Sequence, residues 1–368
     1  MKKITFVLVL LLSFLSNAQL LLTDDFNSLT IGNVGTDFTG VTPGQGGWLT
    51  TSNNGTGAPS ASPPIATTST NAGNSNYQII ANGNASTNGL QIISVDGNSG
   101  SRYMTKTGLA TLWSTRTTGN NVFQFEFDFF TGPATTSKCQ TGIRLYGLDN
   151  STTPATFRTL SGFALNMDTK VLSGIQYLNN AGSFGTYLIN LATGGLVLTA
   201  DTWYRVGFSY DTLTGEARWK TSPSGASKTL ASSYWVGPFN PSEVDMLFLT
   251  PTPTASVFNT VTSTIVYDNF TTKAVASEAL LGTEKIEFLT TQFLILPNPA
   301  KDFVKITSSD FALINAIELS DVNGRIIKSE KINSISEIQV SISELSNGIY
   351  FMKILSDKGT AIKKIVKE

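Results

Sequence analysis

The feature that most limits the fold of this sequence is a strict two-residue alternation of phenylalanine with polar residues. Phenylalanine occupies positions 123, 125, 127 and 129, and Gln124, Glu126 and Asp128 lie between them. A period of two places the four rings on one face of a β-strand and the polar side chains on the other. One face of this strand must therefore be buried, which predicts a sheet with two unlike faces.

The same alternation recurs along the N-terminal two thirds of the chain. Residues 203–211 alternate in this way, 211–215 are typical of a turn, and 216–221 return as a partner strand. Further strands are expected at 77–80, 90–94, 142–148, 162–166, 171–177, 246–250 and 263–270. No stretch shows convincing helical spacing. The pattern predicts an all-β chain whose N-terminal part is a β-sandwich of the jelly-roll type.

Composition divides the chain into two parts. Residues 19–283 contain 12 basic and 15 acidic residues, whereas the 84 residues from 285 to 368 contain 11 and 10. Of the 32 glycines, 28 lie before residue 240. Such a shift indicates two folding units. We expect a cargo domain at 19–272, a linker at 273–292, and a small immunoglobulin-like β-sandwich at 293–368.

The first 18 residues have the pattern of a secretory signal peptide. Two lysines precede an apolar run, and Ser16-Asn17-Ala18 places small residues before an expected cleavage at Gln19. The alternative is a membrane anchor, but the run is shorter than the roughly 18 to 20 residues that a span requires. Residues 1–18 are therefore expected to be removed, and no transmembrane span is expected in the mature chain.

Several classes of function are disfavoured by composition alone. The chain contains no histidine and one cysteine, Cys139, so Ser-His-Asp catalysis, zinc sites and internal disulfides are not expected. Its net charge of −1 offers no electrostatic attraction to nucleic acid. Carboxylate pairs, calcium binding, sugar stacking and a purely structural role stay open.

A set of short motifs near the C-terminus has a physical explanation. Pro297 and Pro299 fix an extended segment that cannot continue a sheet ladder, and the Asn-Gly pairs at 323–324 and 347–348 favour hairpin turns. Together these motifs resemble the type A sorting domain of the type IX secretion system over about 294–368. The residues that carry the resemblance are Pro297, Asn298, Pro299, Asn323, Gly324, Arg325, Asn347, Gly348, Tyr350, Lys363 and Lys364.

This resemblance implies a route of export. The protein would enter the periplasm, engage the type IX secretion machinery and cross the outer membrane. The sorting domain would then be cleaved off in the linker. The cargo would be released, or linked covalently to surface lipopolysaccharide. The expected location is the cell surface or the medium.

Short motifs in the larger domain resemble the concanavalin A-like or laminin-G-like jelly roll over about 22–272. They are Asp24-Asp25-Phe26, Gly46-Gly47-Trp48, the 203–211 strand and Tyr267-Asp268-Asn269-Phe270. Domains with this fold include lectins, glycanases, adhesins and spacers, so the fold does not decide the function. We expect a protein that is not an enzyme and that binds a glycan or adheres to a surface. A structural protein without a small ligand stays an alternative.

Candidate glycan-binding residues are aromatic rings beside polar turns, together with one polar strand face. Trp219, Tyr234 and Trp235 are the rings expected to be exposed, whereas core packing is the main alternative for every tryptophan. The polar face of Gln124, Glu126 and Asp128 is expected to contact sugar hydroxyls.

A polysaccharide hydrolase is the second interpretation. Glu126 and Asp128 resemble the alternating carboxylates of laminarin-type glucanases, in which one acts as nucleophile and another as acid/base. The third acid of that pattern is absent here, so we favour a half-buried strand without catalytic function.

Calcium is the one cofactor that the sequence suggests. Asp24 and Asp25 are expected on the first strand, Asp268 and Asn269 are expected on the last strand, and the resemblance implies that these strands are neighbours. Their oxygens are ligands that calcium accepts. The alternative is that these side chains hydrogen-bond to loop amides.

Overall fold

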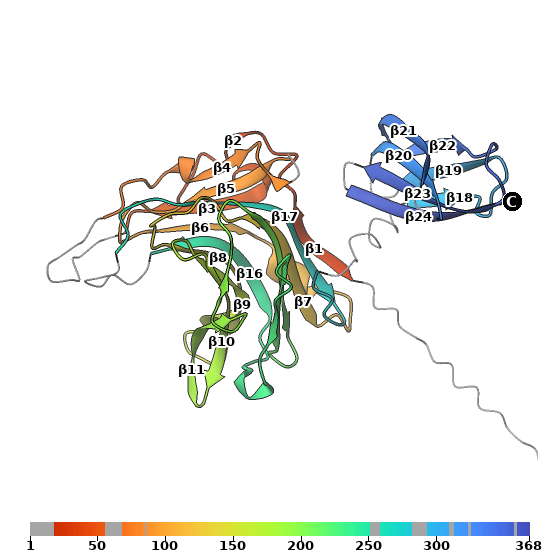
Figure 1. The fold of residues 1–368 in the computed structure, drawn as a ribbon. Coiled ribbons are helices and arrows are strands. Elements are labelled where there is room, and N and C mark those ends of the chain that lie inside the picture. The colour runs from red at the N-terminus through yellow and green to blue at the C-terminus, as the bar shows by residue number, and fades with distance from the viewer. Residues whose placement is uncertain are drawn as a thin grey trace, which may run out of the picture. The chain divides into compact units, whose positions relative to one another are not determined.

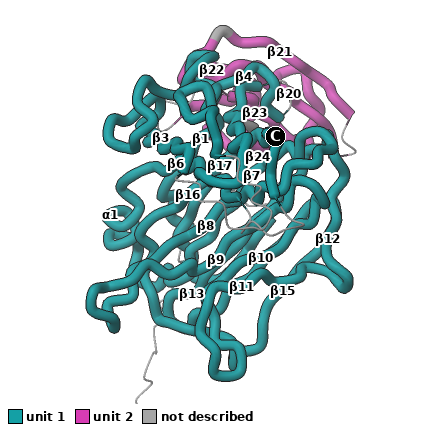
Figure 2. Tube along the Cα trace, turned by 90° about the vertical axis from the view of Figure 1, so that its left-hand side faces the viewer, with its two compact units in different colours: residues 1–281 teal, residues 282–368 magenta. Residues whose placement is uncertain are grey.

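The computed structural model describes residues 18–55, 68–84, 87–250, 258–281, 293–308, 313–322, 325–356 and 359–368. The chain forms two compact units, 1–281 and 282–368, shown in different colours in Figure 2. Residues 1–17 of the expected signal peptide, residues 282–292 of the expected linker, and Asn323 and Gly324 lie outside the described part.

The first unit is built from two antiparallel sheets (Figure 1). In its described part, sheet A has the order β15-β14-β13-β7-β17-β5-β4-β2, and β1 also pairs with β17. Its strands are β1 (Gln19–Asp24), β2 (Gly32–Asn33), β4 (Tyr77–Ile80), β5 (Gly89–Ile93), β7 (Val122–Phe130), β13 (Trp203–Asp211), β14 (Ala217–Ser222), β15 (Ser227–Thr229) and β17 (Thr264–Val275).

Sheet B, in the same part of the chain, has the order β11-β10-β9-β8-β16-β6-β3, and β12 also pairs with β10. Its strands are β3 (Trp48–Asn53), β6 (Ser101–Lys106), β8 (Gln140–Asp149), β9 (Thr156–Asn166), β10 (Val171–Asn180), β11 (Ser183–Asn190), β12 (Leu196–Val197) and β16 (Pro241–Leu249). These strands curve strongly in Figure 1.

The two sheets bury one core between them. The four alternating phenylalanines of β7, at 123, 125, 127 and 129, are at most 2% exposed, and Ile143 and Leu145 of β8 belong to the same core from sheet B. Alternation along each strand therefore defines an inner face toward this core and an outer face away from it. The predicted all-β jelly-roll sandwich is confirmed.

One short helix was not expected from the sequence. Helix α1 (Leu109–Ser114) begins after Gly108, whose backbone is left-handed with φ 99°. Its six residues are too few to show a recognisable 3.6-residue period. It buries Leu109 and Trp113 against the core.

The first unit extends beyond the end that the sequence indicated. Strand β17 pairs with β7 as far as Val275, which lies opposite Val122. Leu280 is 2% exposed, so the chain is packed against the unit up to its end at Leu281. Placing the start of a linker at residue 273 was therefore wrong, because β17 continues past that residue and Ala274, Val275 and Leu280 are buried in the first unit.

The second unit is a small sandwich of two antiparallel sheets, as predicted. One sheet has the order β18-β19-β22 and the other the order β21-β20-β23-β24. The strands are β18 (Phe293–Leu296), β19 (Phe303–Ser308), β20 (Ile314–Asp321), β21 (Ile326–Ile335), β22 (Glu337–Ser341), β23 (Gly348–Ser356) and β24 (Gly359–Lys367). Their inner faces form a separate core that includes Val304, Ile317 and Met352.

The Pro-Asn-Pro segment and the lysine-rich tail are bonded to each other. The Asn298 Nδ2 atom donates to the Lys364 carbonyl at 2.8 Å, and the Val366 amide donates to Asn298 Oδ1 at 2.9 Å. The Ala300 amide also donates to the Val366 carbonyl at 2.9 Å. These bonds give a physical reason for the two motifs to occur together.

Replacing Asn298 by alanine removes two hydrogen bonds to β24. We expect Asn298→Ala to lower the free energy of unfolding of the second unit by about 1 kcal/mol, because an exposed hydrogen bond contributes modestly. Hydrogen exchange of β24 peptides should rise. Tryptophan fluorescence should not change, since all five tryptophans precede residue 236. Asn315→Ala is the matched control, and equal effects in both variants would contradict this account.

Candidate functional site

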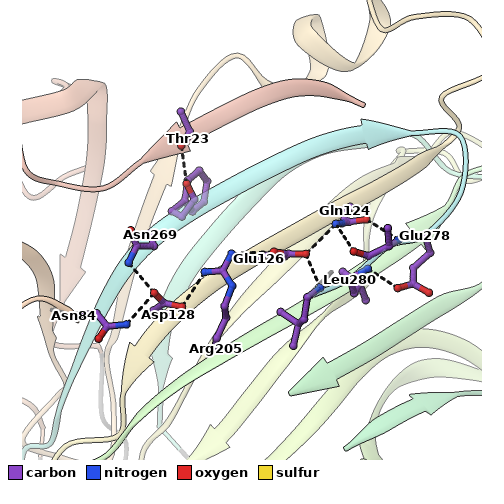
Figure 3. A network of polar contacts seen from close by, with 12 residues as sticks. Thr23, Asn84, Gln124, Glu126, Asp128, Arg205, Asn269, Glu278 and Leu280 are labelled. Carbon is purple, nitrogen blue, oxygen red and sulfur yellow. Dashed lines mark hydrogen bonds and ion pairs between the residues drawn. The ribbon is translucent and has the colours of Figure 1, made fainter. Parts of the chain in front are cut away.

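The outer face of sheet A holds the acids that the sequence singled out (Figure 3). Arg205 on β13 lies opposite Asp128 on β7 in the sheet register. Its guanidinium contacts Asp128 Oδ1 and Glu126 Oε2, both at 2.9 Å. One arginine therefore bridges both carboxylates.

The remaining carboxylate oxygens also have donors. Asp128 Oδ2 accepts from Asn84 Nδ2 at 3.1 Å and from Asn269 Nδ2 at 2.7 Å. Glu126 Oε1 accepts from Gln124 Nε2 at 2.9 Å and from the Leu281 amide at 2.7 Å.

Residues 278–281 cover this face. The Ala279 amide donates to Gln124 Oε1 at 3.1 Å, Lys220 donates to the Leu280 carbonyl at 3.2 Å, and Glu278 pairs with Lys220 at 3.0 Å. Gln124, Glu126 and Asp128 are each at most 8% exposed. Acid/base or nucleophilic catalysis needs carboxyl groups that reach the substrate. This geometry therefore favours a structural network over the sugar contacts expected for these three residues, and over the alternative in which Glu126 and Asp128 catalyse hydrolysis.

Removing the Arg205 side chain should strongly destabilise the first unit. Arg205→Met would leave two buried carboxylates without their cation, and we expect the free energy of unfolding to fall by about 3 kcal/mol. Urea denaturation followed by tryptophan fluorescence measures this change. Arg218→Gln, which breaks a half-exposed ion pair on β14, should cost less than about 1 kcal/mol. A loss for Arg205→Met no larger than that control would contradict the structural role.

The candidate calcium ligands lie on neighbouring strands, because Asp24 on β1 pairs with Phe270 on β17. Each carboxylate already accepts protein donors. Asp24 Oδ2 accepts from Trp48 Nε1 at 2.8 Å, and Asp25 Oδ1 accepts from the Asn27 amide at 3.2 Å. Within the described residues, no group of three or more Asp, Glu, Cys or His side chains is arranged to hold a metal ion.

The Asp268 carboxylate is the most buried of these groups. Its Oδ2 accepts from the Asn84 amide at 2.8 Å, and its Oδ1 accepts from the Asn269 amide at 2.7 Å. Burial raises its pKa to about 6. The Asn269 side chain donates to Asp128 and not to Asp268.

Calcium stays a prediction that chelation tests. An ion held by Asp24, Asp25, Asp268 and Asn269 predicts a lower Tm of the first unit in EDTA and its recovery on adding calcium. The Tm is read from tryptophan fluorescence, and magnesium serves as the control ion. An unchanged Tm in EDTA would contradict the prediction of a calcium ion at these residues.

The structure places the three candidate aromatic rings differently. Trp219 is fully buried, donates its Nε1 to the Gly162 carbonyl at 2.7 Å and lies against Gly174. The expectation that Trp219 is exposed for sugar stacking was therefore wrong. Tyr234 is 36% exposed, and Trp235 is half-buried with its Nε1 bonded to the Leu230 carbonyl.

A large cleft lies elsewhere on the first unit, at the end of sheet B. Its volume is about 940 Å³. Its walls come from α1, the end of β8 with the following turn, β9, β10, β11 and the segment 236–242. The lining residues include Trp113, Arg116, Leu148, Asp149, Asn150, Arg158, Tyr177, Phe184 and Asn240.

Two arginines lie on aromatic rings in this cleft. The Arg158 guanidinium is 4.4 Å from the centre of the Tyr177 ring and pairs with Asp149 at 3.0 Å. The Arg116 guanidinium is 4.3 Å from the centre of the Trp113 ring. Phe184 is 60% exposed beside them. This surface combines the exposed Phe184 ring and the half-buried Tyr177 ring with hydrogen-bond donors that aromatic contacts hold in place.

The sequence interpretation missed this site. Its residues come from separate segments, and none belongs to a recognisable motif. One usable signal was the scarcity of charge, because 19–283 contain only 12 basic residues. Because the first unit has so few charged residues, the presence of each arginine requires a specific structural or functional explanation.

Comparison with protein families identifies the second unit. Residues 294–368 match a family described as Secretion system C-terminal sorting domain. These residues are a type IX sorting domain, and the protein is exported to the cell surface or beyond it. A search of curated proteins found no match to this chain. In the described part of the chain, no helix is long and apolar enough to cross a membrane.

Solved structures resemble the chain at low identity. A glucuronan lyase from the fungus Trichoderma reesei is 9% identical, with 68% of this chain and 99% of that chain covered and a TM-score of 0.37. A CBM2 module of an evolved Dit protein from Lactobacillus casei BL23 phage J-1 is 11% identical, with 72% and 99% covered and a TM-score of 0.36. An alginate lyase from Chlorella virus is also 11% identical, with 53% and 88% covered and a TM-score of 0.36.

These comparisons contradict one expectation from the sequence. We expected that the protein is not an enzyme, but polysaccharide lyases are among the structures that resemble it. The expected absence of catalysis is therefore withdrawn. No activity is transferred to this chain, because likeness at this identity and TM-score concerns the fold alone.

Proposed function

We propose that the first unit binds a polysaccharide in the cleft at the end of sheet B after the sorting domain has directed its export. The observation that best supports this proposal is the pairing of Arg158 with the Tyr177 ring beside the exposed Phe184 ring. A pyranose presents apolar C–H faces and a rim of hydroxyls. Aromatic rings bind the former, while arginine and amide groups bind the latter.

The composition of the cleft fits a chain of sugars better than a small apolar ligand. Asn150 and Asn240 supply amides, Asp149 supplies a carboxylate, and Arg116 and Arg158 supply guanidiniums. The Arg158 guanidinium is held in place by the Asp149 ion pair and by the Tyr177 ring. Donors held in this way lose little conformational entropy when a ligand binds.

The cleft can be tested directly with the full exported chain. Its affinity should be measured for alginate and polygalacturonate, which carry carboxylates, and for the neutral polysaccharides laminarin and xylan. For any polysaccharide that binds, we expect Tyr177→Ala to weaken the affinity by about tenfold, or about 1.4 kcal/mol.

Tyr234→Ala is the matched control for this experiment. Tyr234 is a tyrosine of the same unit that is more exposed than Tyr177, was a candidate from the sequence, and does not line the cleft. Its replacement should leave affinity unchanged. Binding that is lost in Tyr234→Ala and kept in Tyr177→Ala would contradict the cleft and support the original candidates. Binding to none of the four polysaccharides would contradict the proposal itself.

A further inference from the structure

The outer face of sheet B carries a second group of polar side chains, which we call the Asp245 cluster. It consists of Tyr103, Arg144, Tyr146, Glu243 and Asp245. Asp245 on β16 pairs with Thr105 on β6 and with Arg144 on β8, and Glu243 pairs with Tyr146. Residues that are directly paired between strands share a face of the sheet. Three adjacent strands therefore bring these groups together.

The Asp245 cluster lies on the same sheet face as the cleft. Ile143 and Leu145 of β8 point into the core, so Arg144, Tyr146 and Leu148 point outward. Leu148 lines the cleft. Leu148 lies four residue steps along the strand from Arg144, which corresponds to about 13 Å. A ligand chain in the cleft that continued along β8 would reach the cluster.

Two polar atoms of the cluster are buried without a partner. Asp245 is 8% exposed, and its Oδ1 atom has no hydrogen-bond partner. The Nε atom of Arg144 is also buried and unpartnered. The Arg144 Nη2 atom reaches Gln140 Oε1 only at 3.4 Å. Since unpaired buried polar groups cost free energy, this pair of atoms is suited to an incoming polar ligand.

The charge on Arg144 is not compensated by an ion pair within the described residues. Burial and the neighbouring Glu243 carboxylate raise the pKa of Asp245 to about 7. Below that pH, Asp245 is neutral and leaves the Arg144 charge free, whereas above it Asp245 becomes an anion beside Arg144.

The other titratable and charged groups that face Asp245 come from three neighbouring strands. They are Tyr103 from β6, Arg144 and Tyr146 from β8, and Glu243 from β16 itself. Burial raises the pKa of both tyrosines, so they stay neutral in this range. Asp245 is therefore the acid of the cluster whose pKa is raised toward neutrality, and the nearby Glu243 carboxylate contributes to that rise.

We infer that Arg144 binds a carboxylate of an acidic polysaccharide that lies along the outer face of sheet B, and that ionised Asp245 competes for Arg144. This inference rests on the proposed function and names its ligand class. A guanidinium offers donors in a planar fork that matches a carboxylate, and such charge-assisted bonds are stronger than neutral ones. The Nε atom of Arg144, which has no hydrogen-bond partner, is one of the donors in this planar group.

The inference predicts a charge-specific and pH-dependent affinity. Alginate and polygalacturonate should each be compared with their carboxyl-esterified forms, which keep the sugar chain and lose the charge. For the full exported chain, we expect the acidic forms to bind about tenfold more weakly at about pH 8 than at about pH 6. The esterified forms should show no such change, because they bring no anion to Arg144.

Variants of Asp245 and of Arg144 separate the roles of these two residues. Asp245→Asn cannot ionise, so its affinity for the acidic polysaccharide should stay at the low-pH value across the whole range. Arg144→Gln should bind the acidic form about tenfold more weakly and the esterified form normally. Arg144→Lys keeps the positive charge but lacks the planar set of donors. Its affinity for the acidic polysaccharide should therefore lie between that of the unchanged protein and that of Arg144→Gln. Lys228→Gln on β15 removes a cation from sheet A and serves as the control.

The outcomes distinguish this inference from the proposed function. Binding of acidic and esterified chains with equal affinity, or a pH dependence that persists in Asp245→Asn, would overturn the role of the Asp245 cluster. The proposal that the cleft binds a polysaccharide would then be decided by the Tyr177→Ala result alone. Binding to no acidic polysaccharide would also overturn the inference, whereas binding to no polysaccharide of either kind would overturn both. Unchanged tryptophan fluorescence in each variant checks that the first unit is folded.

Discussion

The packing of aromatic rings between the two sheets is the interaction on which the rest of the first unit depends. Phe163 of sheet B meets Phe127 and Phe208 of sheet A edge to face, with ring centres 6.0 Å apart in both pairs. This contact assigns one face of β7 and β13 to the core, and it therefore forces Glu126, Asp128 and Arg205 onto the opposite face. The polar side chains on the outer faces of these strands owe their position to the same two-residue period.

The two outer faces differ in how their charges are satisfied. On sheet A, all four oxygens of Glu126 and Asp128 have donors, which come from Arg205, from the Leu281 amide and from the side chains of Asn84 and Asn269. On sheet B, Arg144 and Asp245 keep unpartnered atoms, and a cleft opens at the end of the same face. A closed network stabilises the fold, whereas open donors and acceptors are suited to a ligand. This contrast supports a structural role for the network on sheet A and the proposal that sheet B carries the binding face.

The sequence predicted the parts of the structure that depend on local pattern. The alternation at 123–129 predicted the sandwich, and Pro297 to Pro299 with the lysine-rich tail predicted the sorting domain. The position of Trp219 could not be predicted, because it depends on Gly174 in the facing sheet. The bridge from Arg205 to Asp128 spans 77 positions. The cleft joins segments that only the folded chain brings together, so no spacing in the sequence indicated it.

Hydrogen exchange of the exported chain, with and without an acidic polysaccharide, tests the central claim most directly. If sheet B is the binding face, the ligand should protect peptides that cover β8, β10 and residues 236–242. Peptides that cover β7 and β13 of sheet A should not change. Protection confined to β7, β13 and residues 278–281, with β8 and β10 unaffected, would contradict the account.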